Sequence, residues 1–367
     1  MADLFDYLHW RGDLSFSQVP PGPVDALIFS ALSYISFTGS PEELPDIPIS
    51  LRDASEEFFQ GCGQEDRCRV KADLKLLAAA AETERFGRTL LLQYRDVLIP
   101  EEDTQFAAIS FLLDSNSAFL AFRGTDYSLT GWKEDFNMSF QESVPAQRLA
   151  AEYVRDFTER YPIPMYLGGH SKGGNLAVYA AVFAPDEIKE RIITAYSNDG
   201  PGFVEEIVSS PEFKKMESKI HTIVPQSSVI GMLLEHKEDY TVIESSFSGG
   251  FFQHDPFSWH VLGNSFVHLG ELDAKGKKHD RVINEWLRRS SPEERRRFTE
   301  TLFGVLESTG AKTLSDLSVD TLGKIRDAVK AYSGLDKESK EHLVLLIRRL
   351  AEVNFGVKPS QKSSSKA

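Results

Sequence analysis

A serine stands between glycines in YLGGHSKGGN, residues 166–175. The pattern Gly169-x-Ser171-x-Gly173 is typical of a serine nucleophile held on a sharp turn between a strand and a helix. An apolar run precedes this serine and a run with helical spacing follows it, so the sequence supplies both elements. Such a turn needs glycines because it strains the backbone and brings the strand close to the helix. We therefore interpret Ser171 as a nucleophile; the alternative is a Gly-Ser turn that only opens a helix.

Acyl transfer from a serine also requires N–H groups that stabilise the negatively charged oxygen of the tetrahedral intermediate. Lys172 follows the serine at the start of the predicted helix, where its backbone N–H can act as one such donor. We expect the amine of Lys172 to face solvent. A second donor is expected in AFRGTD, residues 121–126, because the ligand-binding loops of an open α/β sheet directly follow its strands.

The base is expected to be a histidine late in the chain, because the order in this architecture is serine, acid, histidine. The candidates after the serine are His221, His236, His254, His260 and His268. His254 is favoured because it lies in a loop, GGFFQHDPFSW, that follows a predicted strand. The alternative is a loop histidine that only forms a local hydrogen bond with Asp255.

The acid is assigned to Asp199, which ends the predicted strand RIITAYSND. A carboxylate at this position can orient the imidazole and stabilise its protonated form. The alternative treats Asn198 and Asp199 as ordinary turn residues. Asp255 is a poorer candidate for the acid, because a neighbour in the sequence rarely reaches the adjacent ring.

Two of these motifs together resemble the class 3 lipases, in which a strand ends in Phe-Arg-Gly followed by Thr or Ser and a Trp-x-x-Asp segment comes next. The present chain has FRGT and then GWKEDF. The resemblance implies that Thr125 is an oxyanion residue, that Trp132 and Asp135 support its loop, and that His254 is the base. The chain departs from those lipases in IHTIVPQSSVIG, where an acid is expected. Pancreatic-type lipases carry the acid after the preceding strand, where Asp199 lies here.

The chain is more similar still to a bacterial family of lipase-like hydrolases, the Mbeg-like proteins. The stretches that carry this similarity are DYLHWRGDLSF, ERFG, AFRGTDYSLTGWKEDF, GGHSKGGNLAVYAA, NDGPGF, VPQSSVIGMLL and QHDPFSWHV, with EWLRRSSPEERRRF nearer the end. All but the last lie between Asp6 and Val261. The similarity implies an α/β-hydrolase fold and leaves the substrate open.

Hydrophobic periodicity indicates the same class of fold. Residues 1–100 are expected to be mostly helical, and QFAAISFLL and AFLAF form a predicted hairpin around the turn-forming DSNS. Strands and helices then alternate, which predicts a mainly parallel central sheet covered on both faces. Beyond residue 274 the pattern is purely helical, up to a polar, frayed end.

Charge changes at the same boundary. Residues 275–367 hold 20 Lys and Arg against 13 Asp and Glu, whereas the whole chain has a net charge of −14. We predict a hydrolase domain over residues 1–274, including the helical N-terminal part, and a helical extension over residues 275–367. The acidic body argues against nucleic-acid binding as the main activity. The extension is a candidate for contact with a protein partner or for self-association.

Other classes find little support in the sequence. The first residues have no apolar stretch like that of a signal peptide, and no run of about 18 apolar residues could cross a membrane, so we expect a cytoplasmic protein. Cys62 and Cys68 match no zinc spacing, and the chain has neither a His-Glu-x-x-His motif nor a phosphate-binding loop. We therefore expect no metal and no cofactor.

The sequence thus predicts a serine hydrolase of the lipase or esterase type, acting through an acyl-enzyme on Ser171. Lipid-like acyl esters are expected from the resemblance, and a small soluble ester or a thioester remains open. The segment after Asp126 is short for a lipase lid. The rival interpretation is an inactive hydrolase fold that serves as a binding or scaffold protein, with the helical extension as its interaction module.

Overall fold

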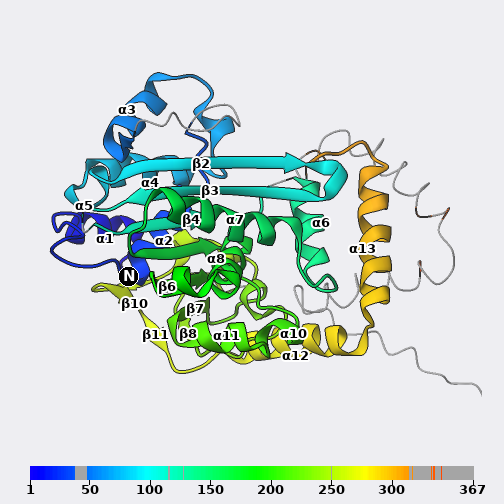
Figure 1. The fold of residues 1–367 in the computed structure, drawn as a ribbon. Helices are drawn as coiled ribbons and strands as arrows, with labels where there is room; N and C mark the ends of the chain where they lie inside the picture. The colour runs from blue at the N-terminus through cyan, green and yellow to red at the C-terminus, as the bar shows by residue number, and fades with distance from the viewer. Residues whose placement is uncertain are drawn as a thin grey trace, which may run out of the picture.

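The structure is a computed structural model, and it describes residues 1–37, 48–114, 116–126, 128–248, 250–313, 316, 332, 334 and 340. One sheet of nine strands passes through it in the order β1-β2-β3-β4-β5-β6-β7-β8-β11 (Figure 1). Strands β4 to β8 are parallel to one another, whereas β1 to β3 and β11 are antiparallel to their neighbours. This arrangement confirms the predicted α/β-hydrolase fold, with its parallel strands at the centre of the sheet.

The strands are β1 Ile49–Ser50, β2 Leu90–Ile99, β3 Thr104–Leu112, β4 Ala118–Phe122, β5 Met165–His170, β6 Ile192–Asn198, β7 Ile220–Pro225, β8 Tyr240–Ile243, β9 Val261–Leu262, β10 Ser265–Phe266 and β11 His268–Leu269. The helices are α1 Leu4–Arg11, α2 Pro23–Leu32, α3 Leu51–Gln60, α4 Lys71–Glu82, α5 Glu84–Gly87, α6 Leu129–Asn137, α7 Pro145–Arg160, α8 Lys172–Phe183, α9 Asp186–Lys189, α10 Glu205–Val208, α11 Pro211–Met216, α12 Ala274–Arg289 and α13 Pro292–Glu307. Strands β9 and β10 form a separate two-stranded ribbon.

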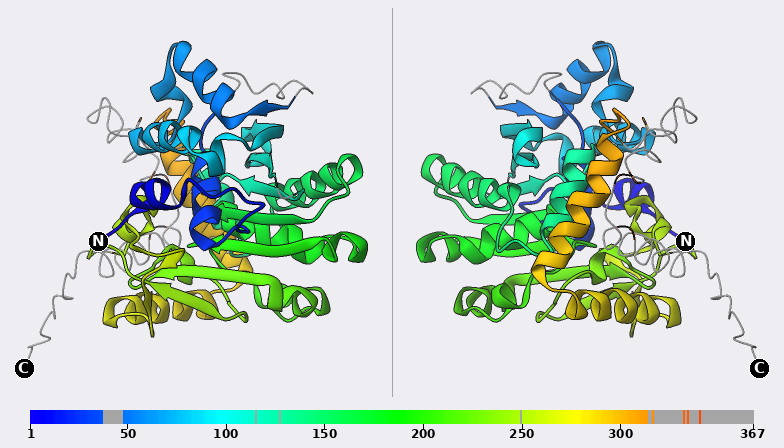
Figure 2. Two further views of the ribbon diagram at one scale, coloured as in Figure 1. Left: turned by 90° about the vertical axis from the view of Figure 1, so that its left-hand side faces the viewer. Right: turned by 90° about the vertical axis from the view of Figure 1, so that its right-hand side faces the viewer.

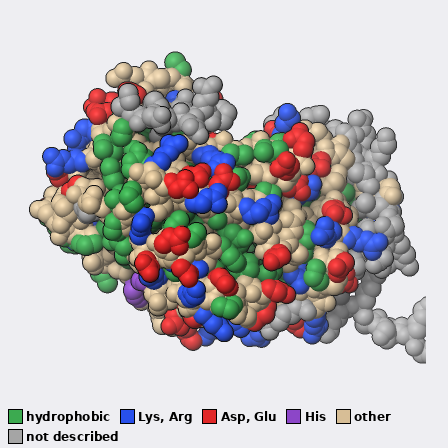
Figure 3. All heavy atoms as spheres, in the orientation of Figure 1, with side chains coloured by type: hydrophobic (Ala, Val, Ile, Leu, Met, Phe, Trp, Pro, Cys, Tyr) green, Lys and Arg blue, Asp and Glu red, His purple; other side chains and the backbone are tan. Residues whose placement is uncertain are grey.

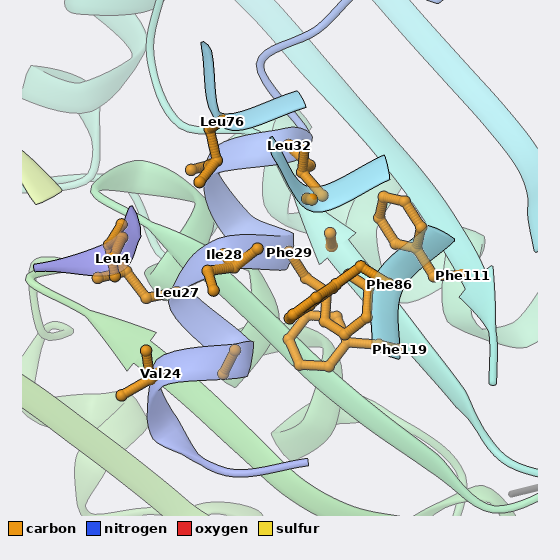
Figure 4. Packing of buried hydrophobic residues seen from close by; sticks show 14 of the residues in the cluster. Leu4, Val24, Leu27, Ile28, Phe29, Leu32, Leu76, Phe86, Phe111 and Phe119 are labelled. Atoms are coloured by element: carbon orange, nitrogen blue, oxygen red, sulfur yellow. The ribbon is translucent and has the colours of Figure 1, made fainter. Parts of the chain in front are cut away.

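The hydrophobic core lies on both faces of the sheet, because successive side chains of a strand point to opposite faces. In β4, Phe119 and Ala121 belong to the core under α1, α2 and α4, whereas Leu120 and Phe122 belong to the core under α7 and α8. Figure 4 shows the first of these cores, in which Phe29 of α2 packs on Phe119 with ring centroids 4.8 Å apart. The central strands are thus covered on both faces.

The predicted hairpin is confirmed, since β3 pairs antiparallel with β4. The N-terminal region is largely helical as expected, but it also contains the ten-residue strand β2, which the sequence did not reveal. The reason is a bulge in β2: its register against β3 shifts between Leu92 and Arg95, and Gln93 between them has φ 46°. A bulge interrupts the alternation of inward and outward side chains by which a strand is recognised.

The start of the C-terminal extension packs on the body. The helical stretch predicted there is divided into α12 and α13, because Ser291 caps α13 through the backbone N–H of Glu294. Helix α13 lies along α6 (Figure 2), where Phe303 meets Phe136 with ring centroids 5.6 Å apart. The part of the predicted helical extension beyond residue 313 lies outside the described residues, apart from single positions, and the domain boundary after residue 274 stays a prediction.

Acidic and basic side chains are interspersed on the face drawn in Figure 3, with hydrophobic side chains between them. Each helix within the described ranges is too short or too polar to span a bilayer.

Candidate active site

Ser171 lies at the sharp turn between β5 and α8. Its backbone has φ 61° and ψ −134°, a conformation that is strained for a residue with a side chain. Its N–H donates to the carbonyl oxygen of Asn198 at 3.0 Å, and its own carbonyl accepts from the N–H of Gly174 at 2.9 Å. Neighbouring β6 and the first turn of α8 thus hold the strained residue in place.

The glycines around the serine are required by close contacts. A Cβ atom on Gly169 would lie 2.1 Å from the carbonyl carbon of Gly173, and a Cβ on Gly173 would lie 2.1 Å from the carbonyl oxygen of Phe122. Such distances are impossible for real Cβ atoms, so only glycine lets α8 approach β4 and β5 this closely. The local sequence therefore determines the geometry expected of a nucleophile turn.

Asp199 and His254 come together although they are 55 residues apart. The Nδ1 atom of His254 lies 2.7 Å from Oδ2 of Asp199. The carboxylate side chain is fully buried, whereas the imidazole is 21% exposed. The backbone of Asp199 has φ 52°, and its N–H donates to the carbonyl oxygen of Ile223 at 2.8 Å, so β7 holds this residue in place directly after β6. Of the carboxylates considered, Asp199 is thus the one in contact with this histidine.

Ser228 supplies a partner of Asp199 that the sequence did not identify. Its hydroxyl donates to the second carboxylate oxygen, Oδ1, at 2.5 Å and accepts from the N–H of Gly231 at 3.0 Å. A Cβ on Gly231 would lie only 2.2 Å from that same Oδ1 atom. The segment where the lipase pattern expects an acid therefore contributes a hydroxyl that binds the acid. In the sequence, the one signal for the role of Ser228 is that this segment, IHTIVPQSSVIG, lacks the acid that class 3 lipases have there.

The loop that carries His254 is held by a buried glutamine. His254 ends the short 3-10 helix Phe252–His254, and Gln253 in that helix accepts from the N–H of Ser227 at 2.7 Å through Oε1. The Gln253 side chain also donates to the carbonyl oxygen of Phe247 at 2.6 Å, and its backbone carbonyl accepts from the Trp259 indole at 2.8 Å. These bonds tie the histidine loop to the end of β7.

The remaining candidates have other partners. His236 contacts Glu238, His260 contacts Glu244, His268 contacts Ser265, and the ring of His221 packs on Tyr196. Asp255 accepts from the backbone N–H of Phe257 at 3.1 Å and is exposed. Among the described residues, therefore, only His254 combines a buried carboxylate partner with a place beside the serine turn, where its ring centroid is 4.4 Å from that of His170.

The loop after β4 lies against the serine turn. A Cβ on Gly124 would be 3.1 Å from Cβ of Ser171. The next residue, Thr125, donates its hydroxyl to Oδ2 of Asp135 in α6 at 2.5 Å. Burial raises the pKa of Asp135 to about 6, although Lys172 and the Thr125 hydroxyl act in the opposite direction. Arg123 adds a second brace that the sequence did not reveal, a two-pronged contact with Asp96 of β2 at 2.8 Å.

Lys172 corrects one expectation: its amine is buried and does not face solvent. The side chain is 1% exposed, and its Nζ atom donates to the backbone oxygen and to Oε1 of Gln105 at 2.8 and 2.6 Å. It also lies 3.0 Å from Oε2 of the fully buried Glu134 in α6. The physical reason is that α6 packs on β3 and brings the carboxylate of Glu134 within reach of the amine, which it neutralises. Lys172 thus joins the serine turn to the helix that carries Asp135.

Trp132 lies on the same helix and packs against residues of α13. Its half-buried ring borders a small cluster of Leu129, Phe303 and Ala311, which joins α6 to α13. Its indole N–H is buried and meets no acceptor within the described part of the chain. The tryptophan therefore fixes α6 through packing.

The structure also contains a hollow of about 670 Å³ away from the serine turn. It is lined by residues such as His221, Thr222, Asp239 and Thr241, at the amino ends of β7 and β8. Ser171 follows the carboxyl end of β5. The hollow therefore lies at the opposite ends of the parallel strands from the serine. Among the residues described, no three His, Cys, Asp or Glu side chains form a group that could hold a metal ion.

Comparisons with known proteins provide one assignment. Three solved structures resemble the chain at low identity. The Rhizomucor miehei lipase propeptide complex has 15% identity and a TM-score of 0.36, with 66% of this chain and 80% of that chain covered. M37 lipase has 14% identity and a TM-score of 0.38, with 57% of this chain and 69% of that chain covered. A triacylglycerol lipase from Penicillium expansum has 9% identity and a TM-score of 0.34, with 60% of this chain and 79% of that chain covered. No curated protein matches the sequence. The Mbeg1-like family model matches residues 80–304, which is more than half of the chain. The protein therefore belongs to the Mbeg1-like family.

Proposed function

We propose that the protein is a serine hydrolase that cleaves acyl esters through an acyl-enzyme on Ser171. The observation that carries this proposal is the 2.7 Å contact between Nδ1 of His254 and the buried carboxylate of Asp199, beside a strained serine turn. A serine, a histidine and a buried carboxylate in this arrangement are the parts of a hydrolytic triad, whatever fold carries them.

The triad chemistry follows from which atoms can donate. A carboxylate only accepts hydrogen bonds, so Nδ1 of neutral His254 carries the proton and Nε2 is left as the acceptor. Nε2 then removes the proton of the Ser171 hydroxyl while Oγ attacks the carbonyl carbon of the ester. The imidazolium returns the proton to the departing alkoxide, and the acyl group stays on Oγ. Water, activated by the same nitrogen, then attacks the acyl carbon and releases the acid, which regenerates the serine.

The oxyanion formed in each attack is assigned to the backbone N–H groups of Thr125 and Lys172. The proposal is supported by the closeness of Gly124 to Ser171 and by the place of Lys172 as the first residue of α8. Asp135 would hold Thr125 through its side chain, and Trp132 would hold α6 through packing. The buried Lys172 amine serves to anchor the turn, because it contacts Gln105, Glu134 and Asp135 and lies away from solvent.

We propose acyl esters of the lipase or esterase type as the substrates, with thioesters as the second class, and a cytoplasmic location without metal or cofactor. Family membership and the triad geometry support the reaction type. The experiment is a panel of p-nitrophenyl esters and acyl thioesters of increasing acyl length, assayed with the wild-type chain and with Ser171→Ala. Hydrolysis that the variant lacks supports the proposal. Equal hydrolysis by both proteins, or none by folded wild type across the panel, would favour a binding or scaffold role.

A further inference from the structure

We propose that His170 and Tyr34 are positioning residues that hold the backbone of the base His254, so that the N-terminal helical region takes part in the active site. The inference rests on the proposed function. His170 stands at the unspecified position directly before the serine in the motif Gly-x-Ser-x-Gly, and its side chain has no part in the hydrolytic steps described above.

His170 links the serine turn to the histidine loop. Its Nε2 atom lies 2.7 Å from the backbone carbonyl oxygen of His254. Its ring also packs on the ring of His254, with centroids 4.4 Å apart and planes inclined by 35°. Because His170 is the last residue of β5 and Ser171 follows it, one rigid strand positions both the nucleophile and the backbone of the base.

The partners of His170 determine its tautomer. A carbonyl oxygen only accepts, so Nε2 of His170 must carry the proton and donate to His254. Neutral imidazole then has Nδ1 as its acceptor, and the hydroxyl of Tyr34 lies 3.3 Å from this atom and 3.5 Å from the backbone oxygen of His170. The phenol therefore donates toward Nδ1, and this contact favours the tautomer that can hold His254.

The surroundings keep this histidine neutral. His170 is fully buried, and burial holds its pKa well below the usual value, with the nearby His254 and Arg69 acting in the same direction. Arg69 lies over the Tyr34 ring, 4.3 Å from its centroid. A neutral ring beside the base has a functional advantage, because a charged one would oppose the imidazolium that forms on His254 during catalysis.

Tyr34 comes from a part of the chain outside the matched residues 80–304. It follows α2 and is 5% exposed. A Cβ on Gly124 would lie 2.2 Å from its hydroxyl, so Tyr34 reaches both the loop after β4 and the serine turn. The N-terminal helices thereby contribute a polar group to the centre of the site as well as a hydrophobic cover.

The experiment compares two amide variants of His170. Gln at this position carries its amide nitrogen about where Nε2 of histidine lies and can donate to the His254 carbonyl, whereas the shorter Asn cannot reach it. We expect His170→Gln to retain most of the wild-type kcat and His170→Asn to lose about 10- to 100-fold, the scale seen when a group that orients a functional side chain is removed. KM should stay close to wild type in both variants. Tyr34→Phe should lower kcat by about 2- to 10-fold, the worth of one neutral hydrogen bond.

Two controls separate positioning from loss of folding. Tyr166→Phe removes a phenol hydroxyl from a buried side chain of the same strand, and its kcat should equal that of wild type. Thermal unfolding of each variant shows whether the fold is intact. Equal kcat values for His170→Gln and His170→Asn, or a rise in KM with kcat unchanged, would overturn the positioning role.

A spectroscopic measurement separates this inference from the proposed function. In protein labelled with nitrogen-15 at histidine, the ring signals of His170 should report a neutral imidazole protonated at Nε2 from pH 5 to pH 8. A proton on Nδ1, or titration within that range, would overturn the inference even if the enzyme is active. Wild-type protein that hydrolyses nothing yet shows the expected His170 signals would instead contradict the proposed function, and the positioning role with it.

Discussion

Asp199 and Ser228 face each other at the carboxyl ends of β6 and β7, and the serine hydroxyl donates to Oδ1 of the aspartate at 2.5 Å. The other carboxylate oxygen is the one that contacts His254. The two oxygens of one buried carboxylate thus have separate partners from separate elements. Ser228 fixes the plane of the carboxylate, and the plane determines where the imidazole lies.

Replacing Ser228 by Ala should therefore lower kcat/KM for ester hydrolysis by about 10- to 100-fold, because a hydrogen bond to a charged group is worth about 1.5–3 kcal/mol. The adjacent serine is a matched control, since Ser227 donates its hydroxyl to Asp273 at 2.5 Å and not to the triad. Ser227→Ala should leave kcat/KM near the wild-type value. If the two variants lose activity equally, Ser228 has no special part in holding the acid.

Asp199→Asn tests the tautomer of the base. Ser228 donates to Oδ1 and would retain the amide oxygen as its acceptor, so the amide nitrogen would face His254 and require Nδ1 to accept. The proton would then sit on Nε2, where it blocks abstraction of the serine proton, and kcat should fall by about 10⁴-fold. Steady-state kinetics measure this. Asp255→Asn is the control, and a fall in kcat there with none at Asp199 would reverse the assignment of the acid.

The buried ion pair of Lys172 and Glu134 should contribute strongly to the stability of the fold. Lys172→Met leaves an uncompensated carboxylate at a site with 0% exposure and should lower the free energy of unfolding by about 3–5 kcal/mol. Glu134→Gln should also destabilise, and the double variant should lose less than the sum of the two. Urea denaturation of the four proteins measures this coupling.

The exposed pair of Lys215 and Asp186 is the control, and Lys215→Met should change stability little. Additive losses at Lys172 and Glu134 would contradict the coupling.

Asp135 should impose a pH dependence on stability. Its pKa is raised from 3.8 in the unfolded chain to about 6 by burial, so the folded state binds the proton more tightly. The contribution of Asp135 to stability is then full below about pH 4 and is lost as the pH rises to about 6. Asp135→Asn keeps an oxygen acceptor for Thr125 but cannot ionise. The variant should therefore gain stability relative to wild type as the pH rises from 4 to 7, as measured by thermal unfolding. A constant difference across this range would contradict the raised pKa.

Much of the fold could be predicted because its signals are local. The glycines around Ser171 and the alternation of strands and helices from β3 to β8 depend on neighbours in the sequence. The strand β2 escaped prediction because its bulge at Gln93 breaks the two-residue period. Its antiparallel pairing with β3 on both sides of the bulge is a tertiary feature that the pattern of β2 alone does not reveal.

The site was less predictable because its partners meet only in the folded chain. Asp199 and His254 could be proposed from their positions after strands, but their contact could not. Ser228, His170 and Tyr34 carry no charge or motif that marks them as partners of those residues. The direction of the Lys172 amine was wrongly predicted because it depends on Glu134, 38 residues away on another helix.

The most direct test is covalent. The purified chain is treated with a fluorophosphonate probe, which reacts quickly only with an activated serine, and the modified peptide is identified by mass spectrometry. The triad predicts one adduct, on Ser171, formed at a rate that falls strongly in both His254→Ala and Asp199→Ala. Folded wild-type protein without an adduct on Ser171, or one that forms as quickly in those variants, would contradict the assignment of Ser171, His254 and Asp199 as a hydrolytic triad.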